Sequence, residues 1–179
     1  MTSQSLDSKI KETIITVQDF PKPGVLYKDI APLFLDPVLC NAMVDTLAEH
    51  YKSQSVEAVL GLESRGFLIG MPLALKLGVP FILIRKKGKL PRETYIESYD
   101  LEYGNATIEM QRDALSKGQR VLIHDDVLAT GGTACAAGRL VQQAGAEIMG
   151  YSFLVELGFL EGRKTISTFS NNIYTLATY

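Results

Sequence analysis

Short apolar runs alternate along this chain with segments in which apolar residues recur every three or four positions. The helical spacing predicts helices over 6–17, 36–51, 64–77 and 130–144. Asp36 followed by Pro37 marks the start of the second helix, and Gly78 and Gly145 mark the ends of the third and fourth. The apolar runs predict buried strands over 56–61, 81–84, 107–111, 120–124, 147–157 and 173–177. This order is typical of an α/β fold with a mainly parallel central sheet flanked by helices.

Two segments interrupt the pattern. Residues 20–24 read Phe-Pro-Lys-Pro-Gly, which ends any helix and makes a rigid turn. Residues 93–105 are polar and contain three tyrosines, and no period runs through them. A loop of this length inside a compact domain is often a lid over an active site. A β-hairpin packed on the sheet is the structural alternative.

Composition and charge narrow the class of protein. The length of 179 residues fits one domain, and 46% hydrophobic with 21% charged residues is an ordinary globular composition. The net charge of −2 gives no argument for a nucleic-acid or anionic-membrane partner. Two cysteines and two histidines, all scattered, leave little for a disulfide framework or a zinc site. No apolar run reaches the ~18 residues of a membrane span, and the N-terminus has no apolar signal segment, so we expect a cytoplasmic protein.

The clearest chemistry follows the predicted strand at 120–124. Asp125 and Asp126 come directly after the strand, and the run Ala129-Thr130-Gly131-Gly132-Thr133 then leads into a helix. Two glycines let the backbone approach an anion closely, and the helix N-terminus and threonine hydroxyls add donors. Because carboxylates repel phosphate, the acid pair needs a partner rich in hydroxyls or a magnesium ion. A ribose 5-phosphate satisfies both halves of this motif.

A second anion site follows the predicted strand at 56–61. Glu63, Ser64 and Arg65 stand before the next helix, where backbone N–H groups and a guanidinium can hold an anion. The run Arg85-Lys86-Lys87-Gly88-Lys89-Leu90-Pro91-Arg92 adds five positive charges in eight residues. Ligands bind outside the carboxyl ends of parallel strands, so we expect this run to attract a polyphosphate to the same edge of the sheet.

These segments resemble the motifs of type I phosphoribosyltransferases, and in particular those of the adenine phosphoribosyltransferases. Residues 121–133 are similar to the motif that binds phosphoribosyl pyrophosphate (PRPP). The others are similar to the pyrophosphate loop (61–67), the basic segment (85–91), the catalytic loop (98–104, Ser-Tyr-Asp-Leu-Glu-Tyr-Gly) and the segment that covers adenine (20–30). The resemblance extends from about Asp19 to Gly162, and nothing is carried over beyond it.

The resemblance implies purine salvage, in which the 5-phosphoribosyl group of PRPP is transferred to adenine to give AMP and pyrophosphate. It implies Mg²⁺ as cofactor, which Asp125 and Asp126 would reach through water or the ribose diol. It further implies a homodimer of single-domain chains over 1–179. Each chain would have an N-terminal hood that covers the base over 1–35 and a flexible catalytic loop over 93–105.

The same resemblance assigns roles to individual residues. The ribose and 5′-phosphate would be held by Asp125, Asp126, Ala129, Thr130, Gly131, Gly132 and Thr133. Pyrophosphate would be held by Glu63, Ser64, Arg65, Arg85, Lys86 and Lys89, with a cis peptide bond at Glu63-Ser64, and adenine by Leu26, Tyr27 and Lys28. The expected catalytic residues are Glu102, Tyr103 and Arg65, with Glu102 handling the proton on adenine N9.

Three residues depart from the family pattern. Lys28 replaces a more frequent Arg, Arg92 stands where Gly is more frequent, and His124 precedes the acid pair in place of an aliphatic residue. His124 is either a buried core histidine or a group that tunes the acids. Two other functions stay open: a phosphoribosyltransferase for hypoxanthine-guanine, xanthine or orotate, and a PRPP-sensing regulator that binds nucleic acid. The net charge of −2 disfavours the regulator.

Overall fold

The computed structural model describes residues 5–100 and 105–179. Its elements follow in chain order. They are α1 (Leu6–Thr13), β1 (Ile15–Gln18), β2 (Leu26–Asp29), the 3₁₀ helix η1 (Ala31–Leu35), α2 (Pro37–Tyr51), β3 (Ala58–Leu62), α3 (Gly66–Leu77), β4 (Phe81–Lys86), β5 (Thr94–Asp100), β6 (Asn105–Gln111), β7 (Arg120–Leu128), α4 (Gly132–Gln143), β8 (Glu147–Glu156), the 3₁₀ helix η2 (Gly158–Leu160), α5 (Gly162–Ile166) and β9 (Ile173–Thr178).

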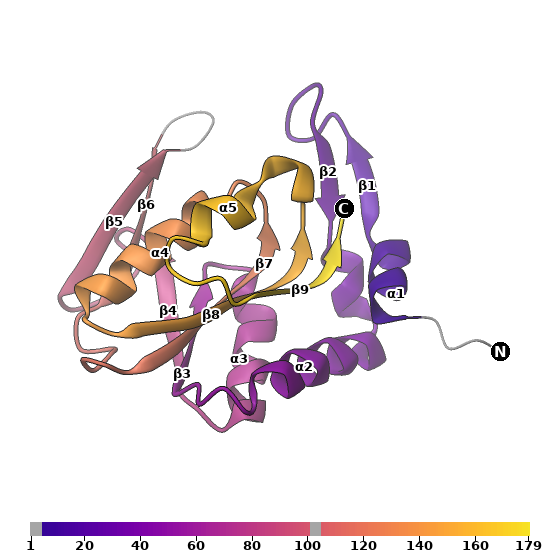
Figure 1. Ribbon diagram of the computed structural model, residues 1–179. Helices are drawn as coiled ribbons and strands as arrows, with labels where there is room; N and C mark the ends of the chain where they lie inside the picture. The colour runs from indigo at the N-terminus through magenta and orange to yellow at the C-terminus, as the bar shows by residue number, and fades with distance from the viewer. Residues whose placement is uncertain (1–4, 101–104) are drawn as a thin grey trace.

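A seven-stranded sheet in the order β5-β6-β4-β3-β7-β8-β9 forms the centre of the molecule (Figure 1). The run from β4 to β9 is parallel, and β6 and β5 add an antiparallel edge. The expected α/β fold with a mainly parallel sheet is confirmed. The carboxyl ends of β3, β4 and β7 therefore lie at one edge of the sheet, where the sequence places its candidate chemistry.

The sheet separates two hydrophobic clusters. The first packs α1, η1, α2 and α3 against residues such as Val59 and Leu122. The second packs α4, α5 and β6 against residues such as Leu60 and Ile123. Since neighbouring residues of one strand point to opposite faces, burial of both faces explains why these strands read as continuous apolar runs rather than as alternating patterns.

The first predicted helix is too long. We expected helix over 6–17, but α1 ends at Thr13, and β1 pairs antiparallel with β2, from Ile15↔Asp29 to Gln18↔Leu26. The run Ile14-Ile15-Thr16-Val17 is β-branched throughout, which favours extended backbone over helix. The N-terminal segment thus forms a small two-stranded sheet rather than one helix and a loop.

The polar segment at 93–105 is also more regular than expected. Thr94–Asp100 forms β5, which pairs with β6 along its whole length, so the alternative of a β-hairpin is correct. The alternation was hidden because both faces of β5 mix polar and large residues, with Tyr95, Glu97 and Tyr99 on one face. Flexibility of this segment stays a prediction.

Two projections rise from the same end of the molecule (Figure 1). One is the β5–β6 hairpin, and the other is the β1–β2 pair with its connecting turn, in which the Phe20-Pro21 peptide bond is cis. The last residue, Tyr179, supports the second projection, since the Lys28 ammonium lies 4.1 Å from the centre of its ring. Within the described ranges, no helix is long and apolar enough to cross a membrane.

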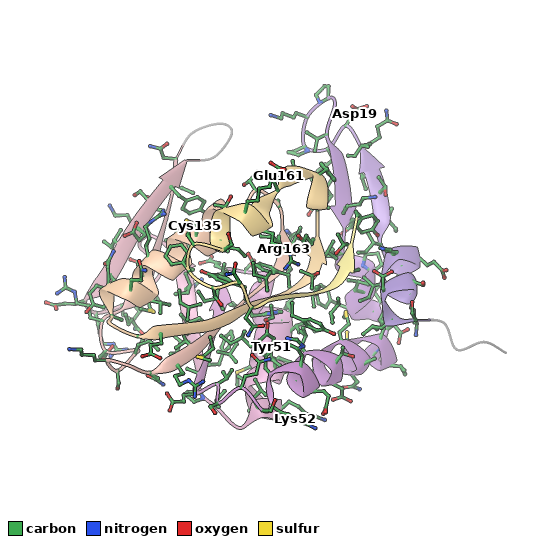
Figure 2. The ribbon with its side chains drawn as sticks, viewed as in Figure 1. Asp19, Tyr51, Lys52, Cys135, Glu161 and Arg163 are labelled. Atoms are coloured by element: carbon green, nitrogen blue, oxygen red, sulfur yellow. The ribbon has the colours of Figure 1, made fainter. Side chains whose placement is uncertain are left out.

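Tyr51 and Tyr151 allow the contribution of one buried hydrogen bond to the stability of the core to be measured. Tyr51 ends α2 (labelled in Figure 2), and its buried hydroxyl donates to the Tyr151 carbonyl oxygen at 2.8 Å. We predict that Tyr51→Phe lowers the free energy of unfolding by about 1–2 kcal/mol, because a buried hydrogen bond is lost. Urea denaturation followed by circular dichroism measures this change.

Tyr151→Phe is the matched control. The Tyr151 hydroxyl is buried and has no hydrogen-bond partner among residues 5–100 and 105–179. Its removal should leave stability unchanged or raise it, since an unpaired buried polar group is costly. Equal losses in the two variants would contradict the prediction.

Candidate active site

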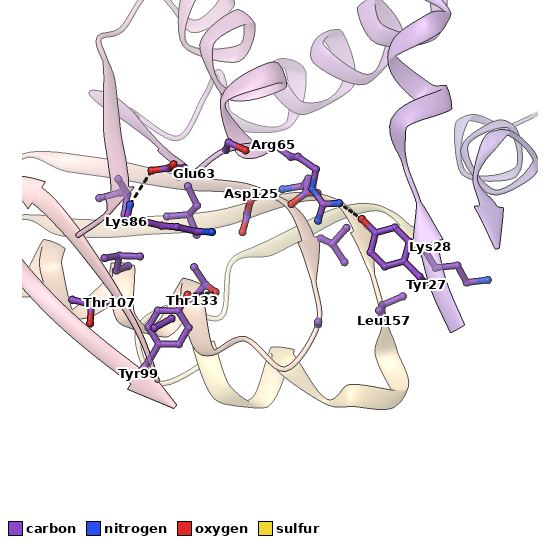
Figure 3. Close-up of a pocket in the computed structure, with 18 of the residues that line it drawn as sticks. Tyr27, Lys28, Glu63, Arg65, Lys86, Tyr99, Thr107, Asp125, Thr133 and Leu157 are labelled. Atoms are coloured by element: carbon purple, nitrogen blue, oxygen red, sulfur yellow. Dashed lines mark hydrogen bonds and ion pairs between the residues drawn. The ribbon is translucent and has the colours of Figure 1, made fainter. Parts of the chain in front are cut away.

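A cavity of about 910 Å³ opens at the carboxyl ends of β3, β4 and β7 (Figure 3). Four segments far apart in the sequence line it. They are the hood (Val25, Leu26, Tyr27, Lys28), the ends of β3 and β4 with the loop after β3 (Leu62, Glu63, Ser64, Arg65, Ile84, Lys86, Lys87), the hairpin (Tyr99, Asn105, Ala106, Thr107, Ile108) and the end of β7 with its loop (Asp125, Asp126, Val127, Ala129, Thr133), together with Leu157. The fold thus brings the predicted hood, anion loops and acid pair to one cavity.

The acid pair lies on the wall of this cavity and is tied to Arg65. Burial, together with the charge of Asp126, raises the pKa of the Asp125 carboxyl. Asp126 is 5% exposed, and its Oδ2 atom lies 2.6 Å from Arg65 Nε in an ion pair. Burial lowers the pKa of the Arg65 guanidinium, but Asp126, Tyr27 and Asp125 together outweigh burial and raise this pKa. Asp126 Oδ2 is buried, and among the described residues its close partner is this guanidinium.

The loop from Ala129 to Thr133 has the features of an anion cradle. Gly131, at φ = +83°, precedes the first residue of α4, and no side chain from the described part of the chain caps the helix. The first N–H groups of a helix have no intrahelical acceptor. Here they border a small cavity of about 70 Å³ lined by residues 127–134 with Asp125 and Phe153. The predicted phosphate loop is therefore an uncapped helix start.

The short helix α5 buttresses this loop, which the sequence pattern did not indicate. The Thr165 hydroxyl donates to the Thr130 carbonyl oxygen at 2.9 Å. A Cβ on Gly162 would lie 2.1 Å from the Ala129 carbonyl oxygen, so only glycine allows this close approach. Arg163, labelled in Figure 2, pairs through two nitrogens with the buried Glu156 at the end of β8. The C-terminal segment thus fixes the position of the loop.

The second anion loop connects β3 to α3. The Glu63-Ser64 peptide bond is cis, as the resemblance implied. Glu63 Oε2 accepts from the Lys86 backbone N–H at 2.9 Å and lies 3.1 Å from Arg85 Nε. Burial alone would raise the pKa of Glu63, but these contacts outweigh it and lower the pKa. The carboxylate therefore links the loop to the end of β4, as Figure 3 shows for Lys86.

Two of the expected pyrophosphate residues do not line the cavity. The Arg85 guanidinium is held by Glu63 and by the Lys89 carbonyl oxygen. Lys89 itself donates its backbone N–H to Glu109, and neither residue belongs to the cavity wall. Lys86 and Lys87 are the basic residues that reach it from this run. The sequence could not show which of these four basic residues reach the cavity, because all four belong to one basic stretch.

The hood contributes Leu26, Tyr27 and Lys28 to the cavity, as expected. The Tyr27 hydroxyl accepts a hydrogen bond from Arg65 (dashed line in Figure 3), and the Tyr27 ring contacts Phe20 edge-on at 5.0 Å between centroids. The Lys28 ammonium instead turns to the Thr16 hydroxyl at 2.9 Å. Tyr27 therefore joins the hood to the loop that carries Arg65.

Sequence reasoning missed several lining residues, and two expected ones are not described. Val127 lies near the end of β7, and Leu157 directly follows β8. The rule that ligands bind at the carboxyl ends of strands could have identified both. Asn105 and Thr107 required the hairpin to be recognised. Glu102 and Tyr103, the expected catalytic residues, lie outside the described residues.

His124 is a core histidine. Its ring is fully buried, Nδ1 lies 2.9 Å from the Ser152 hydroxyl, and burial lowers the pKa of the ring to about 4. The ring lies near Gly70 of α3, on the face of β7 opposite to Asp125. A neutral ring on that face does not tune the acids by charge.

The acid pair is also suited to a magnesium ion that is bound jointly by the protein and by a phosphorylated ligand. Within the described residues, no group of three or more His, Cys, Asp or Glu side chains could enclose a metal. Mg²⁺ keeps several waters and uses one or two carboxylates with substrate phosphates. The neighbouring carboxylates of Asp125 and Asp126 at the edge of the cavity match that mode of binding.

Comparison with known proteins agrees with this geometry. The chain matches the phosphoribosyl transferase domain over residues 39–168. Adenine phosphoribosyltransferase of Cytophaga hutchinsonii is 48% identical over 178 residues, which are 99% of this chain and 98% of the relative. A parallel sheet with an acid pair and a Thr-Gly-Gly loop at its edge defines, together with this match, a phosphoribosyltransferase.

Solved structures narrow the class. The adenine phosphoribosyltransferase of Rhodothermus marinus has a TM-score of 0.90 and 48% identity, over 97% of this chain and 98% of that one. The enzyme of Saccharomyces cerevisiae, solved with adenine and D-2,5-dideoxy-2,5-imino-altritol 1,6-bisphosphate, has a TM-score of 0.90 and 39% identity, over 96% and 98%. The chain belongs to the adenine phosphoribosyltransferase family.

The contact of Gly162 with the phosphate loop leads to a prediction about substrate binding. Gly162→Ala should displace the loop, because the new Cβ would meet a backbone oxygen. Overpacking of this kind costs about 1–3 kcal/mol. We expect the KM for PRPP to rise on the order of 10-fold, with little change in the KM for adenine, as steady-state kinetics would measure.

Gly158→Ala is the matched control for this variant. Its Cβ would meet nothing closer than the Tyr179 carbonyl oxygen at 3.3 Å, so we expect wild-type kinetics. A Gly162→Ala variant with the wild-type KM for PRPP would show that α5 does not position the loop.

Burial of His124 leads to a prediction about pH. The pKa of the ring is about 4 in the folded protein, against an ordinary value of 6.5. The neutral ring therefore stabilises the fold above pH 6.5, and this contribution is lost as pH falls from 6.5 to 4. At about 1.4 kcal/mol per pKa unit, the loss is on the order of 3 kcal/mol.

Denaturant unfolding of the wild type and of His124→Val at several pH values measures this loss as the difference between two curves. The difference removes the contribution of Asp125, which has the opposite sign because its pKa is raised in the folded protein. Curves that stay parallel between pH 6.5 and 4 would contradict the prediction.

Proposed function

We propose that the 910 Å³ cavity is where this chain transfers the 5-phosphoribosyl group of PRPP to adenine, giving AMP and pyrophosphate. One observation carries the proposal. An acid pair, an uncapped Thr-Gly-Gly helix start and an arginine-bearing loop border the same cavity, beneath a hood. A sugar diol, a phosphate monoester and a pyrophosphate each match one of these surfaces. The cavity thus suits the parts of PRPP together with a planar base.

The ribose and its phosphate would occupy the β7 side. Asp125 and Asp126 border the cavity side by side, and their carboxylates would accept hydrogen bonds from the ribose hydroxyls. Ala129, Thr130, Gly131, Gly132 and Thr133 surround the smaller cavity, where backbone N–H groups and the α4 dipole favour a phosphate. The buttress from Thr165 and Gly162 holds this loop in place.

Pyrophosphate would lie against Glu63, Ser64, Arg65 and Lys86. Arg65 contributes a charged guanidinium, and Lys86 an ammonium from the opposite wall. Arg85 and Lys89 add positive charge from beside the cavity, with Arg85 held in place by Glu63. Neutralising the leaving group lowers the barrier, because negative charge develops on it as the glycosidic bond breaks.

Adenine would enter under the hood. Leu26, Tyr27 and Lys28 line that side of the cavity, and Leu157 and Val127 supply apolar surface near them. Because the Tyr27 hydroxyl holds Arg65, the base-covering segment and the pyrophosphate loop are positioned together. Backbone groups of a strand such as β2 can read the base edge whichever side chain stands at Lys28.

In the reaction, adenine N9 forms a bond to C1′ of the ribose while the bond between C1′ and the pyrophosphate oxygen breaks. N9 loses its proton. By resemblance, Glu102 takes that proton and Tyr103 lies near the reacting carbon. Bound Mg²⁺ would supply charge neutralisation of the pyrophosphate, with Asp125 and Asp126 holding it through water or the ribose hydroxyls. The chain's own residues orient the two substrates and exclude water.

We further propose a homodimer that acts in the cytoplasm, where phosphorylated sugars are made. Leu68, Met71 and Leu75 are 52%, 44% and 69% exposed on one face of α3, at a spacing of three and four residues. An exposed apolar stripe of this kind suits contact with a second copy. Sedimentation equilibrium of the wild type tests this, and a monomer at micromolar concentration would exclude it.

Base specificity provides the decisive test of function. Pyrophosphate release should be measured with PRPP and Mg²⁺ and with adenine, hypoxanthine, guanine or orotate in turn. We expect release with adenine only. Release with another base would keep the PRPP assignment and exclude the adenine assignment, and no release with any base would contradict the proposed reaction.

The double variant Asp125→Asn, Asp126→Asn tests the role of the acid pair, and Asp45→Asn is its control. The double variant should raise the KM for PRPP and lower kcat, since the diol loses its acceptors. Asp45→Asn, on the exposed surface of α2, removes a carboxylate far from the cavity and should behave as wild type. Unchanged constants in the double variant would remove the acid pair from the proposed mechanism.

A further inference from the structure

Among the described residues, the backbone of the β5–β6 hairpin is bonded to the main sheet at the middle of β6. β6 pairs with β4 at Arg85↔Glu109 and Lys86↔Ile108, and the Lys87 N–H donates to Thr107. In contrast, β5 and β6 pair with each other over seven positions, as far as Asp100↔Asn105. The outer half of the hairpin therefore extends beyond the sheet (Figure 1) and needs other contacts to hold it.

Helix α4 supplies those contacts. Glu97 and Tyr99 lie on one face of β5, since they are two residues apart in a strand. Glu97 Oε2 accepts from Arg139 Nε at 2.9 Å, and Gln143 also donates to Glu97. Nearer the cavity, the Thr133 hydroxyl donates to the Tyr99 hydroxyl at 2.9 Å. The hairpin is thus attached to the same helix whose N-terminus forms the phosphate loop.

Thr133 takes part both in the phosphate loop and in the contact with the hairpin. It is the last residue of the phosphate loop and borders both the main cavity and the smaller one. A hydroxyl carries one proton and two lone pairs, so Thr133 cannot donate to Tyr99 and to a phosphate oxygen at once. When phosphate accepts the Thr133 proton, the Tyr99 hydroxyl can reverse its role and donate to Thr133 Oγ1.

This reversal forms a chain in which Tyr99 donates to Thr133 and Thr133 donates to phosphate. Hydrogen bonds in series polarise and strengthen one another, and a bond to an ionised acceptor is stronger than a neutral one. We propose that Tyr99 is a positioning residue that couples binding of the 5′-phosphate at the Ala129–Thr133 loop to attachment of the β5–β6 hairpin. The inference rests on the proposed role of that loop and adds a specific partner on the hairpin.

The test uses ribose 5-phosphate as probe and the Tyr99→Phe variant, which keeps the ring and removes the hydroxyl. Ribose 5-phosphate should slow hydrogen–deuterium exchange in peptides from 94–100 and 105–111 of the wild type, and should not do so in Tyr99→Phe. The affinity for ribose 5-phosphate should fall roughly 2- to 3-fold, because the variant loses the strengthening of a hydrogen bond that already exists without the ligand. The KM for PRPP should rise by a similar factor, while the KM for adenine stays unchanged.

Tyr95→Phe is the matched control, because Tyr95 lies on the same face of β5 and packs in the cluster with α4. It should keep the wild-type affinity for ribose 5-phosphate and the ligand-induced protection. Without ligand, Tyr99→Phe should unfold at a slightly lower temperature than Tyr95→Phe, because it loses the hydrogen bond from Thr133. The change in exchange on adding ligand is compared within each variant, which separates coupling from this loss of stability.

Three outcomes decide the matter. Loss of protection and of affinity in Tyr99→Phe alone supports the coupling. Protection and affinity equal to wild type in Tyr99→Phe overturn it and leave the proposed function intact. Failure of the wild-type protein to bind ribose 5-phosphate overturns both, because the loop would then hold no 5′-phosphate.

Discussion

Parallel pairing of β3 with β7 is the constraint on which the site depends. The register aligns Leu60 with Ile123 and Gly61 with His124, so β3 ends at Leu62 beside Asp125, which lies within the last four residues of β7 rather than after the strand as the sequence suggested. Glu63–Arg65 and Asp125–Asp126 therefore emerge side by side, close enough for Arg65 and Asp126 to form an ion pair at 2.6 Å. A slip by one residue would move each acid to the other face of the sheet. Burial of both faces excludes such a slip, so the packing of the core fixes the chemistry of its edge.

Three charged residues that line the cavity, Arg65, Asp126 and Glu63, already form ion pairs before any substrate binds. Arg65 pairs with Asp126, and Arg85 pairs with Glu63. A pyrophosphate that takes Arg65 must therefore compete with a buried carboxylate, which is costly to leave without a partner. The ribose diol of the same substrate can hydrogen-bond to that carboxylate. PRPP carries both groups, whereas pyrophosphate carries one and a free base carries neither, so the arrangement favours a ligand that replaces both partners together.

Much of this architecture could be predicted from the sequence, and the exceptions have physical causes. Apolar runs in the sequence predicted the buried strands, and the paired glycines after a strand predicted the loop 129–133. β5 was missed because Tyr95, Glu97 and Tyr99 share one face with mixed polarity. The buttress from Gly162 and Thr165 was missed because a contact between distant segments leaves no local period. Arg85 could not be separated from Lys86 until the position of Glu63 was known.

Each of the two hydrophobic clusters, one on either side of the sheet, supports a different part of the substrate-binding site. The hood rests on the cluster that contains Ile14, Ile30 and Leu33, whereas the phosphate loop and the hairpin rest on the cluster with α4 and Ile166. Since substitutions that share no contacts add almost independently, the packing of the core beneath the hood can change without disturbing the packing beneath the phosphate loop. The hydrogen bond from Arg65 to the Tyr27 hydroxyl joins the two sides. A chain built this way can acquire a new base preference during evolution and keep its binding of the activated sugar, provided that this link is kept.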